Sequence, residues 1–146
     1  MTLDILYEDD HLIAIHKPHG LLVHRTRMAT DVTQFAVQIL RDQIGGDHVY
    51  PVHRLDRKTS GVLLFAKSKI ANQDVQQLIR ERKVSKKYTA IVRGFVEQSG
   101  TINYALLKKD KLQEAETDYE LIRHYEIDLP FGKFNTSRYS LSLIHI

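Results

Sequence analysis

Short apolar segments, many of them alternating with polar positions, dominate this chain. Such segments predict strands, because successive side chains of a strand point to opposite faces. The predicted strands cover residues 3–7, 12–15, 21–23, 62–66, 88–92, 101–107, 119–122 and 137–143. Several of them follow one another too closely for a helical crossover, so the expected fold class is α+β, with a mostly antiparallel mixed sheet flanked by helices.

Apolar residues fall at helical spacing in two places. Residues 31–43 are predicted to form a helix with Thr30 as its N-cap, and the pair Gly45-Gly46 is predicted to end it. Residues 72–82 are predicted to form a second, amphipathic helix. The apolar face of this second helix consists of Val75, Leu78 and Ile79, which are expected inside the protein.

One segment carries most of the chemistry. It reads His53-Arg54-Leu55-Asp56-Arg57-Lys58-Thr59-Ser60-Gly61 and runs directly into the apolar strand 62–66. Its Thr-Ser-Gly triplet is typical of a turn. His53, at the start of the segment, is expected to hold this loop in place by a hydrogen bond. Asp56 stands between two arginines, which bind phosphate and favour the ionised form of a carboxyl group. The segment therefore suits chemistry on a polyanion.

This segment resembles the catalytic motif of the RluA-type pseudouridine synthases, which isomerise uridine in RNA without a cofactor. Two further segments, one on each side, are similar to motifs of the same family in the same order. Upstream lies Lys17-Pro18-His19-Gly20-Leu21-Leu22-Val23-His24, and downstream lies Lys86-Lys87-Tyr88-Thr89-Ala90-Ile91-Val92-Arg93-Gly94. The resemblance implies an isomerase whose catalytic domain occupies residues 1–146, with no additional N-terminal RNA-binding module.

The resemblance also implies roles for single residues. Asp56 matches the catalytic aspartate, which acts at the sugar either as a nucleophile or as a base. Arg54 matches the arginine that enters the RNA stack when the target nucleotide is extruded, although a surface ion pair is the plainer interpretation. Tyr88 matches the tyrosine that stacks on the flipped uracil, although its alternation with Ala90 and Val92 also fits an ordinary strand residue.

Basic residues near these motifs are candidates for phosphate contacts. Arg57 lies beside Asp56, and residues 80–87 contain five basic side chains, among them Lys86 and Lys87. Such a run can position RNA without reading its bases. It is equally compatible with a solvated helix end, where cations complement the helix dipole.

Composition narrows the classes of function. The 146 residues carry a net charge of +3, which is compatible with an RNA partner. The chain has no cysteine, and its eight histidines follow no ligand spacing, so neither a metal nor a cofactor is expected. Neither a signal peptide nor an apolar run of membrane length is visible. A cytoplasmic protein with no membrane partner is therefore expected. We also expect a monomer whose partner is RNA.

Three segments resemble the tRNA-modifying branch of the family, namely residues 23–25, 41–45 and 129–139. The expected substrate is therefore a specific uridine in tRNA. A ribosomal RNA pseudouridine synthase of the same family and an inactive, truncated RNA-binding fragment remain the alternatives. The family continues beyond the predicted strand 137–143 into a further conserved motif, so we expect this chain to be C-terminally truncated. Its last strand should then lack neighbours and expose an apolar face.

Overall fold

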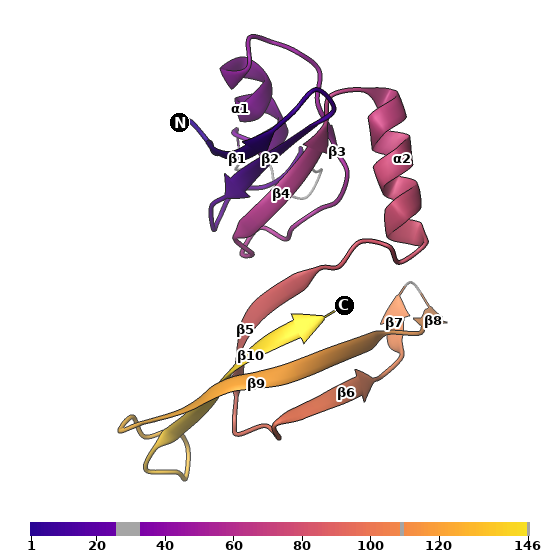
Figure 1. The fold of residues 1–146 in the computed structure, drawn as a ribbon. Coiled ribbons are helices and arrows are strands. Elements are labelled where there is room, and N and C mark those ends of the chain that lie inside the picture. Colours follow the sequence, from indigo (N-terminus) through magenta and orange to yellow (C-terminus); the bar gives the residue numbers. More distant parts are fainter. Residues whose placement is uncertain (26–32, 109, 146) are drawn as a thin grey trace. The chain divides into compact units, whose positions relative to one another are not determined.

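The computed structural model describes residues 1–25, 33–108 and 110–145, which form two compact units (Figure 1). The first unit is Met1–Lys83 and the second is Val84–Ile146. The assignment of residues 1–146 to one catalytic domain stays a prediction.

The first unit contains a four-stranded sheet and two helices. Its strands are β1 (Asp4–Glu8), β2 (Leu12–Lys17), β3 (Tyr50–Pro51) and β4 (Gly61–Ala66). They lie in the order β1-β2-β4-β3, and every pair is antiparallel. The helices are α1 (Ala36–Gln43) and α2 (Lys69–Arg80). The predicted strands 3–7, 12–15 and 62–66 are thereby confirmed.

The hydrophobic core of this unit is built on β2, β4 and α1. In β2 the alternation of side chains directs Ile13, Ile15 and Lys17 to the buried face. Leu63 and Phe65 of the neighbouring β4 are also completely buried. Burying one such apolar side chain contributes roughly 1.5–3 kcal/mol, so these two paired strands form a rigid base for the loops at their ends.

Helix α1 begins at Ala36, later than predicted, because the residue before it is held extended. Phe35 forms an isolated parallel bridge with Leu22, and it caps the helix without a side-chain hydrogen bond. The backbone N–H of Ala36 donates to Leu22 O at 2.8 Å, which satisfies a donor that has no partner within the helix. The predicted N-cap Thr30 lies outside the described residues.

The prediction of a strand at residues 21–23 was wrong. Only Leu22 is paired there, so the segment contributes a single bridge and not a strand. The glycine end of α1 is confirmed, because both Gly45 and Gly46 have positive φ angles. The N–H of Gly46 donates to Arg41 O at 2.7 Å, a bond typical of a helix that ends in a Schellman motif.

Helix α2 begins three residues before the predicted start, because Ser68 caps it. The side chain of Ser68 accepts a hydrogen bond from the N–H of Ala71 at 3.1 Å. Val75 and Ile79 are half-buried, but Leu78 is 41% exposed, so the prediction that Leu78 lies inside was wrong. The helix contacts β3 and β4, and none of its residues is fully buried.

The second unit is a four-stranded antiparallel sheet with a small hairpin. The sheet has the order β5-β10-β9-β6, and β7 pairs only with β8. Its strands are β5 (Lys87–Arg93), β6 (Ser99–Asn103), β7 (Leu106–Lys108), β8 (Lys111–Gln113), β9 (Glu116–Ile127) and β10 (Ser137–His145).

Most predicted strands of this unit are confirmed, with two corrections. The predicted strand 101–107 is two strands, because β6 pairs with β9 and the chain then turns into the β7–β8 hairpin. The expectation that the last strand would lack neighbours is wrong. β10 lies inside the sheet and pairs with β5 on one side and β9 on the other.

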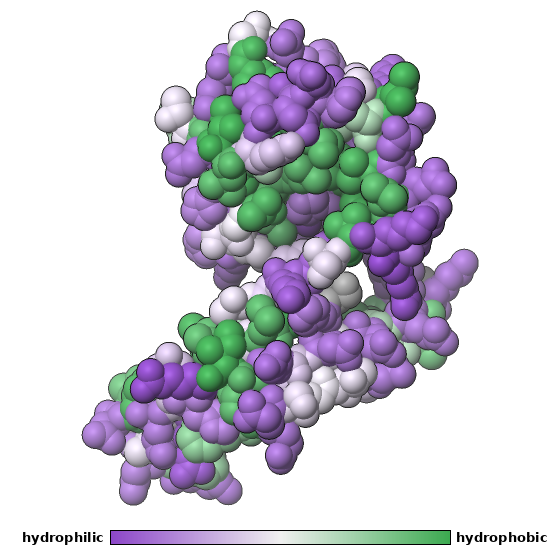
Figure 2. Space-filling view, viewed as in Figure 1, coloured by the Kyte–Doolittle hydropathy of each residue, from purple (hydrophilic) through white to green (hydrophobic). Residues whose placement is uncertain are grey.

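The two faces of this second sheet differ in exposure. In β5, Tyr88 and Val92 on one face are half-buried, whereas Ile91 on the opposite face is 73% exposed. We call these the covered face and the open face. The fully buried residues described in this unit are all serines, namely Ser137, Ser140 and Ser142. Figure 2 shows that apolar and hydrophilic residues lie side by side on the surface of this unit.

In the part of the chain that the structure describes, no helix is both long and apolar enough to span a membrane.

Candidate active-site loop

Asp56 is exposed and lies in the loop between β3 and β4. The preceding residue, Leu55, is buried and anchors the loop to the first unit. The N–H of Thr59 donates to Asp56 O at 3.0 Å, which closes a turn directly after the carboxylate. Gly61 then begins β4 with φ +128°, as expected of a glycine at this point. The carboxylate is therefore presented to solvent from a short, anchored turn.

The Lys-Pro-His-Gly turn after β2 is bonded to the same loop. The N–H of Gly20 donates to Arg57 O at 2.8 Å, and Nε of Arg57 donates to Gly20 O at 3.2 Å. These reciprocal bonds join two segments that lie nearly forty residues apart in sequence. Two of the three motifs found in the sequence thus form one local structure around Asp56.

Lys17, at the end of β2, occupies the centre of this structure and has no exposed surface. Its Nζ donates to the backbone oxygens of Leu21 at 2.7 Å, Pro18 at 3.1 Å and Arg57 at 3.4 Å. Burial lowers the pKa of Lys17, while the negative charge of Asp56 acts in the opposite direction. The hydrogen bond to Arg57 O also ties the end of β2 to the residue that follows Asp56.

The lowered pKa of Lys17 predicts a dependence of stability on pH. Between the lowered pKa and the ordinary value of 10.5, the unfolded chain binds more protons than the folded chain at this site. The contribution of Lys17 to the free energy of unfolding should therefore increase as the pH rises through this window, and should be constant below it. We expect the difference in unfolding free energy between the natural chain and Lys17→Met to widen on passing from pH 7 to pH 10.5 in urea titrations. A difference that does not change with pH would contradict a lowered pKa.

His53 and Arg54 precede Asp56 and differ in their surroundings. Nε2 of His53 accepts a hydrogen bond from the N–H of Leu64 in β4 at 3.2 Å, which confirms that His53 holds the loop. Arg54 is exposed. Within the described residues it forms no ion pair, so the structure does not show the surface pairing considered as its alternative.

The remaining predicted site residues belong to the second unit. Tyr88 is half-buried on the covered face of β5, opposite Ile144 of β10. Lys87 is exposed at the start of β5, and Lys86 directly before it is half-buried. The structure thus places the candidates in two groups, with Arg54, Asp56 and Arg57 on one loop of the first unit and the other three at the start of β5.

The basic run between the two groups begins at the end of α2. Lys83 forms an ion pair with Glu81 at 2.6 Å. This ion pair neutralises one of the five positive charges of residues 80–87. Arg82 has a positive φ of 55° and follows the C-cap of α2. The run therefore includes a solvated helix end, as its plainer interpretation expected, before it reaches Lys86 and Lys87.

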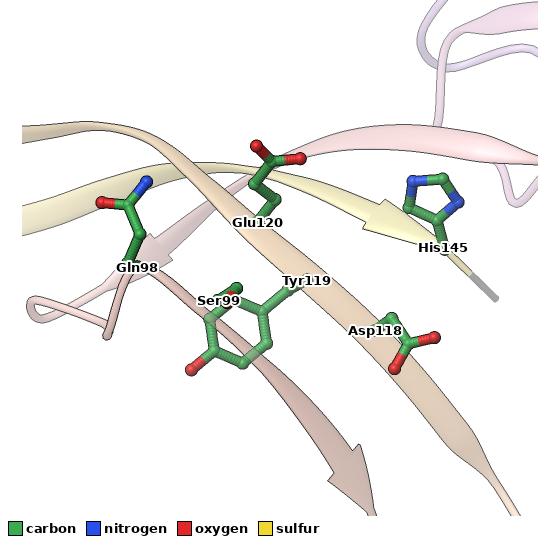
Figure 3. Close-up of a pocket in the computed structure, with 6 residues that line it drawn as sticks. All are labelled: Gln98, Ser99, Asp118, Tyr119, Glu120 and His145. Carbon is green, nitrogen blue, oxygen red and sulfur yellow. The ribbon is translucent and has the colours of Figure 1, made fainter.

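A pocket of about 450 Å³ lies in the second unit and contains none of the predicted site residues (Figure 3). Its lining residues are Gln98, Ser99, Asp118, Tyr119, Glu120 and His145. Two carboxylates at its wall repel phosphate, so this pocket is a poor candidate for RNA. Nowhere in the described ranges do three or more histidine, aspartate or glutamate residues gather in a way that could hold a metal ion.

Sequence reasoning found the motif that contains Lys17 but gave this lysine no role. The signal was present in the alternation of β2, where Ile13, Ile15 and Lys17 occupy the same face. A lysine on the buried face of a strand requires oxygen partners. The following Pro18 and Gly20 make a turn whose carbonyl groups supply such partners.

The sequence matches the family model of RNA pseudouridylate synthase over residues 11–146. The chain belongs to this family. It is 45% identical to a tRNA pseudouridine synthase C of Vibrio parahaemolyticus, over 97% of this chain and 62% of that protein. It is 49% identical to the protein of the same name from Pasteurella multocida, over 97% of this chain and 63% of that protein. The chain thus spans less than two thirds of the length of these relatives.

Solved structures give the same fold. Human RNA pseudouridylate synthase domain containing 4 matches with a TM-score of 0.67 at 27% identity, over 97% of this chain and 58% of that chain. Human RNA pseudouridylate synthase domain containing 1 matches with a TM-score of 0.75 at 21% identity, over 99% of this chain and 59% of that chain. The α+β pseudouridine synthase fold expected from the sequence is confirmed.

Proposed function

We propose that this chain is part of an enzyme that isomerises a uridine of tRNA to pseudouridine, with Asp56 as its catalytic carboxylate. The observation that carries the proposal is the position of Asp56. It is exposed on a turn that is bonded to a second family motif and lies near the buried cation Lys17. The tRNA substrate is suggested by relatives named tRNA pseudouridine synthase C.

The reaction leaves the composition of the nucleotide unchanged. The bond between N1 of uracil and C1′ of ribose breaks, the uracil rotates, and C5 forms the new bond to C1′. The proton on C5 is then lost and N1 gains one, so no oxidant or reductant is required. Asp56 acts at the sugar, where it either attacks C1′ or removes a proton, and both roles require an ionised carboxylate.

The other candidates take the roles of the family residues that they match. Arg54, an exposed planar cation on the Asp56 loop, fills the RNA stack when the uridine is extruded. Tyr88 stacks on the extruded uracil. Arg57, Lys86 and Lys87 contact phosphate groups and hold the RNA in place. We propose that the protein acts as a monomer in the cytoplasm.

The substrate class is tested with transcripts that carry no modification. The chain is incubated separately with tRNA transcripts and with ribosomal RNA fragments, and the digested nucleosides are analysed by mass spectrometry. We expect pseudouridine in a tRNA and not in the ribosomal fragments. Pseudouridine only in ribosomal RNA would establish the alternative substrate, and its absence from both would contradict catalysis by this chain.

A further inference from the structure

Arginine and aromatic side chains gather at one end of the open face of the second sheet, near the β9–β10 hairpin. Arg93 of β5 lies opposite Tyr139 of β10, which in turn lies opposite Tyr125 of β9. The guanidinium carbon of Arg93 is 3.5 Å from the ring centroid of Phe131, and that of Arg123 is 5.4 Å from the ring centroid of Tyr125. We call Arg93, Arg123, Tyr125 and Phe131 the arginine–aromatic cluster.

The hairpin holds Phe131 in a defined position. Phe131 and Phe134 exchange two backbone hydrogen bonds of 3.0 and 3.1 Å, and Gly132 between them has a positive φ of 61°. The backbone of Phe131 is therefore fixed by these hydrogen bonds, although the residue is 57% exposed. Tyr125 is also exposed, at 43%. The rings of Phe131 and Tyr125 therefore present apolar surface to solvent, and an arginine lies beside each of them.

The two arginines of the cluster keep their charge available. Within the described residues, neither Arg93 nor Arg123 forms an ion pair or a side-chain hydrogen bond. Arg138 behaves differently, because its Nε lies 3.0 Å from Glu126 and its charge is thereby neutralised. The cluster therefore has a net positive charge, because it contains two arginines and no acidic residue.

A surface that combines arginines with exposed aromatic rings is suited to binding unpaired RNA in particular. A guanidinium that stacks on a ring through its flat face keeps its N–H donors, which lie in the plane, free to bind phosphate oxygens. Exposed aromatic rings offer stacking surfaces for unpaired bases. The acidic pocket of this unit, lined by Asp118 and Glu120, has the opposite charge and marks a part of the unit that RNA should avoid.

We propose that the arginine–aromatic cluster is a second RNA-contacting surface, at which Arg93 and Arg123 bind the phosphate backbone while Tyr125 or Phe131 stacks on an unpaired base. The inference rests on the proposed function in one respect, namely that RNA is the substrate. The cluster shares no residue with the Asp56 loop. It contributes to the affinity and placement of the RNA and takes no part in the chemical step.

The test compares binding of a fluorescently labelled tRNA transcript by anisotropy, using the full chain and single substitutions. Arg93→Ala and Phe131→Ala should each raise Kd about tenfold, within the range known for loss of a stacking or phosphate contact. Arg93→Ala should also reduce the slope of log Kd against log salt concentration by about one. The matched control is Lys111→Ala, which removes one exposed positive charge from β8 and should change Kd less than threefold. Far-UV circular dichroism establishes that each variant is folded.

Several results would overturn the proposal. If Arg93→Ala and Phe131→Ala bind tRNA as the natural chain does, or if the natural chain binds no tRNA, the cluster is not an RNA surface. If these substitutions abolish a dimer seen in sedimentation and leave the Kd for tRNA unchanged, the cluster instead contacts a second copy of the chain. The proposed function is judged separately by the nucleoside analysis of the natural chain. Pseudouridine formed by the natural chain, together with unchanged binding by Arg93→Ala and Phe131→Ala, would reject the second surface and leave the proposed function standing.

Discussion

Replacing Asp56 by asparagine is expected to lower the rate of pseudouridine formation by roughly 10³-fold or more, because the substitution removes the only proposed nucleophile or base. Asparagine has nearly the same volume and keeps the backbone oxygen that accepts from Thr59. The turn should therefore persist. The Kd for tRNA should stay within about threefold of the natural value, since phosphate contacts supply most of the affinity. The measurements are single-turnover rates on a tRNA transcript and binding by anisotropy.

The matched control for this prediction is Asp74→Asn, which neutralises an exposed carboxylate on α2 of the same unit. It should leave both the rate and the affinity unchanged. A variant Asp56→Asn that forms pseudouridine at a rate within tenfold of the natural chain would show that another group performs the chemistry. Equal losses in both variants would point to a general effect of charge.

Replacing Lys17 by methionine should destabilise the first unit by about 2–3 kcal/mol at neutral pH, which is the usual cost of leaving buried acceptors without their charged donor. Methionine has a similar shape, but it cannot donate to the carbonyl oxygens of Pro18, Leu21 and Arg57. Two of these oxygens belong to the turn after β2 and the third belongs to the Asp56 loop, so the rate of pseudouridine formation should fall together with stability. Urea denaturation gives the free energy of unfolding.

The control for Lys17 is Lys58→Met, which removes an exposed ammonium group from the Asp56 loop itself. Its effect on the free energy of unfolding should be below about 0.5 kcal/mol, as is usual for surface substitutions. If Lys17→Met proves as stable as Lys58→Met, the hydrogen bonds of Lys17 do not support the fold.

The sequence predicted secondary structure well where side-chain periodicity and pairing agree. β2 and β4 were found because their apolar faces are buried in one core. Prediction failed where a tertiary contact overrides local preference. Helical spacing begins near residue 31, but Phe35 is extended and bridged to Leu22, and α1 begins only at Ala36. The central position of β10 also depends on long-range pairing, which periodicity does not reveal.

The candidate site, too, was predicted only in part. The motif around Asp56 was recognisable because its residue types and order are specific, and the structure adds how the loop is held. The partners of Lys17 are backbone oxygens, which leave no signature in the identity of side chains. The arginine–aromatic cluster is assembled from two strands, β5 and β9, and the β9–β10 hairpin, so its residues are scattered along the sequence and no local pattern unites them.

We propose above all that Asp56 supplies the catalytic carboxylate for the isomerisation of a uridine in tRNA. The most direct measurement is the release of tritium from a tRNA transcript labelled at C5 of uridine, with the natural chain and Asp56→Asn assayed side by side. Our account predicts release by the natural chain, because C5 loses its proton when the new bond to the sugar forms, and no release above background by the variant. Equal release by both chains, or none by the natural chain, would contradict it.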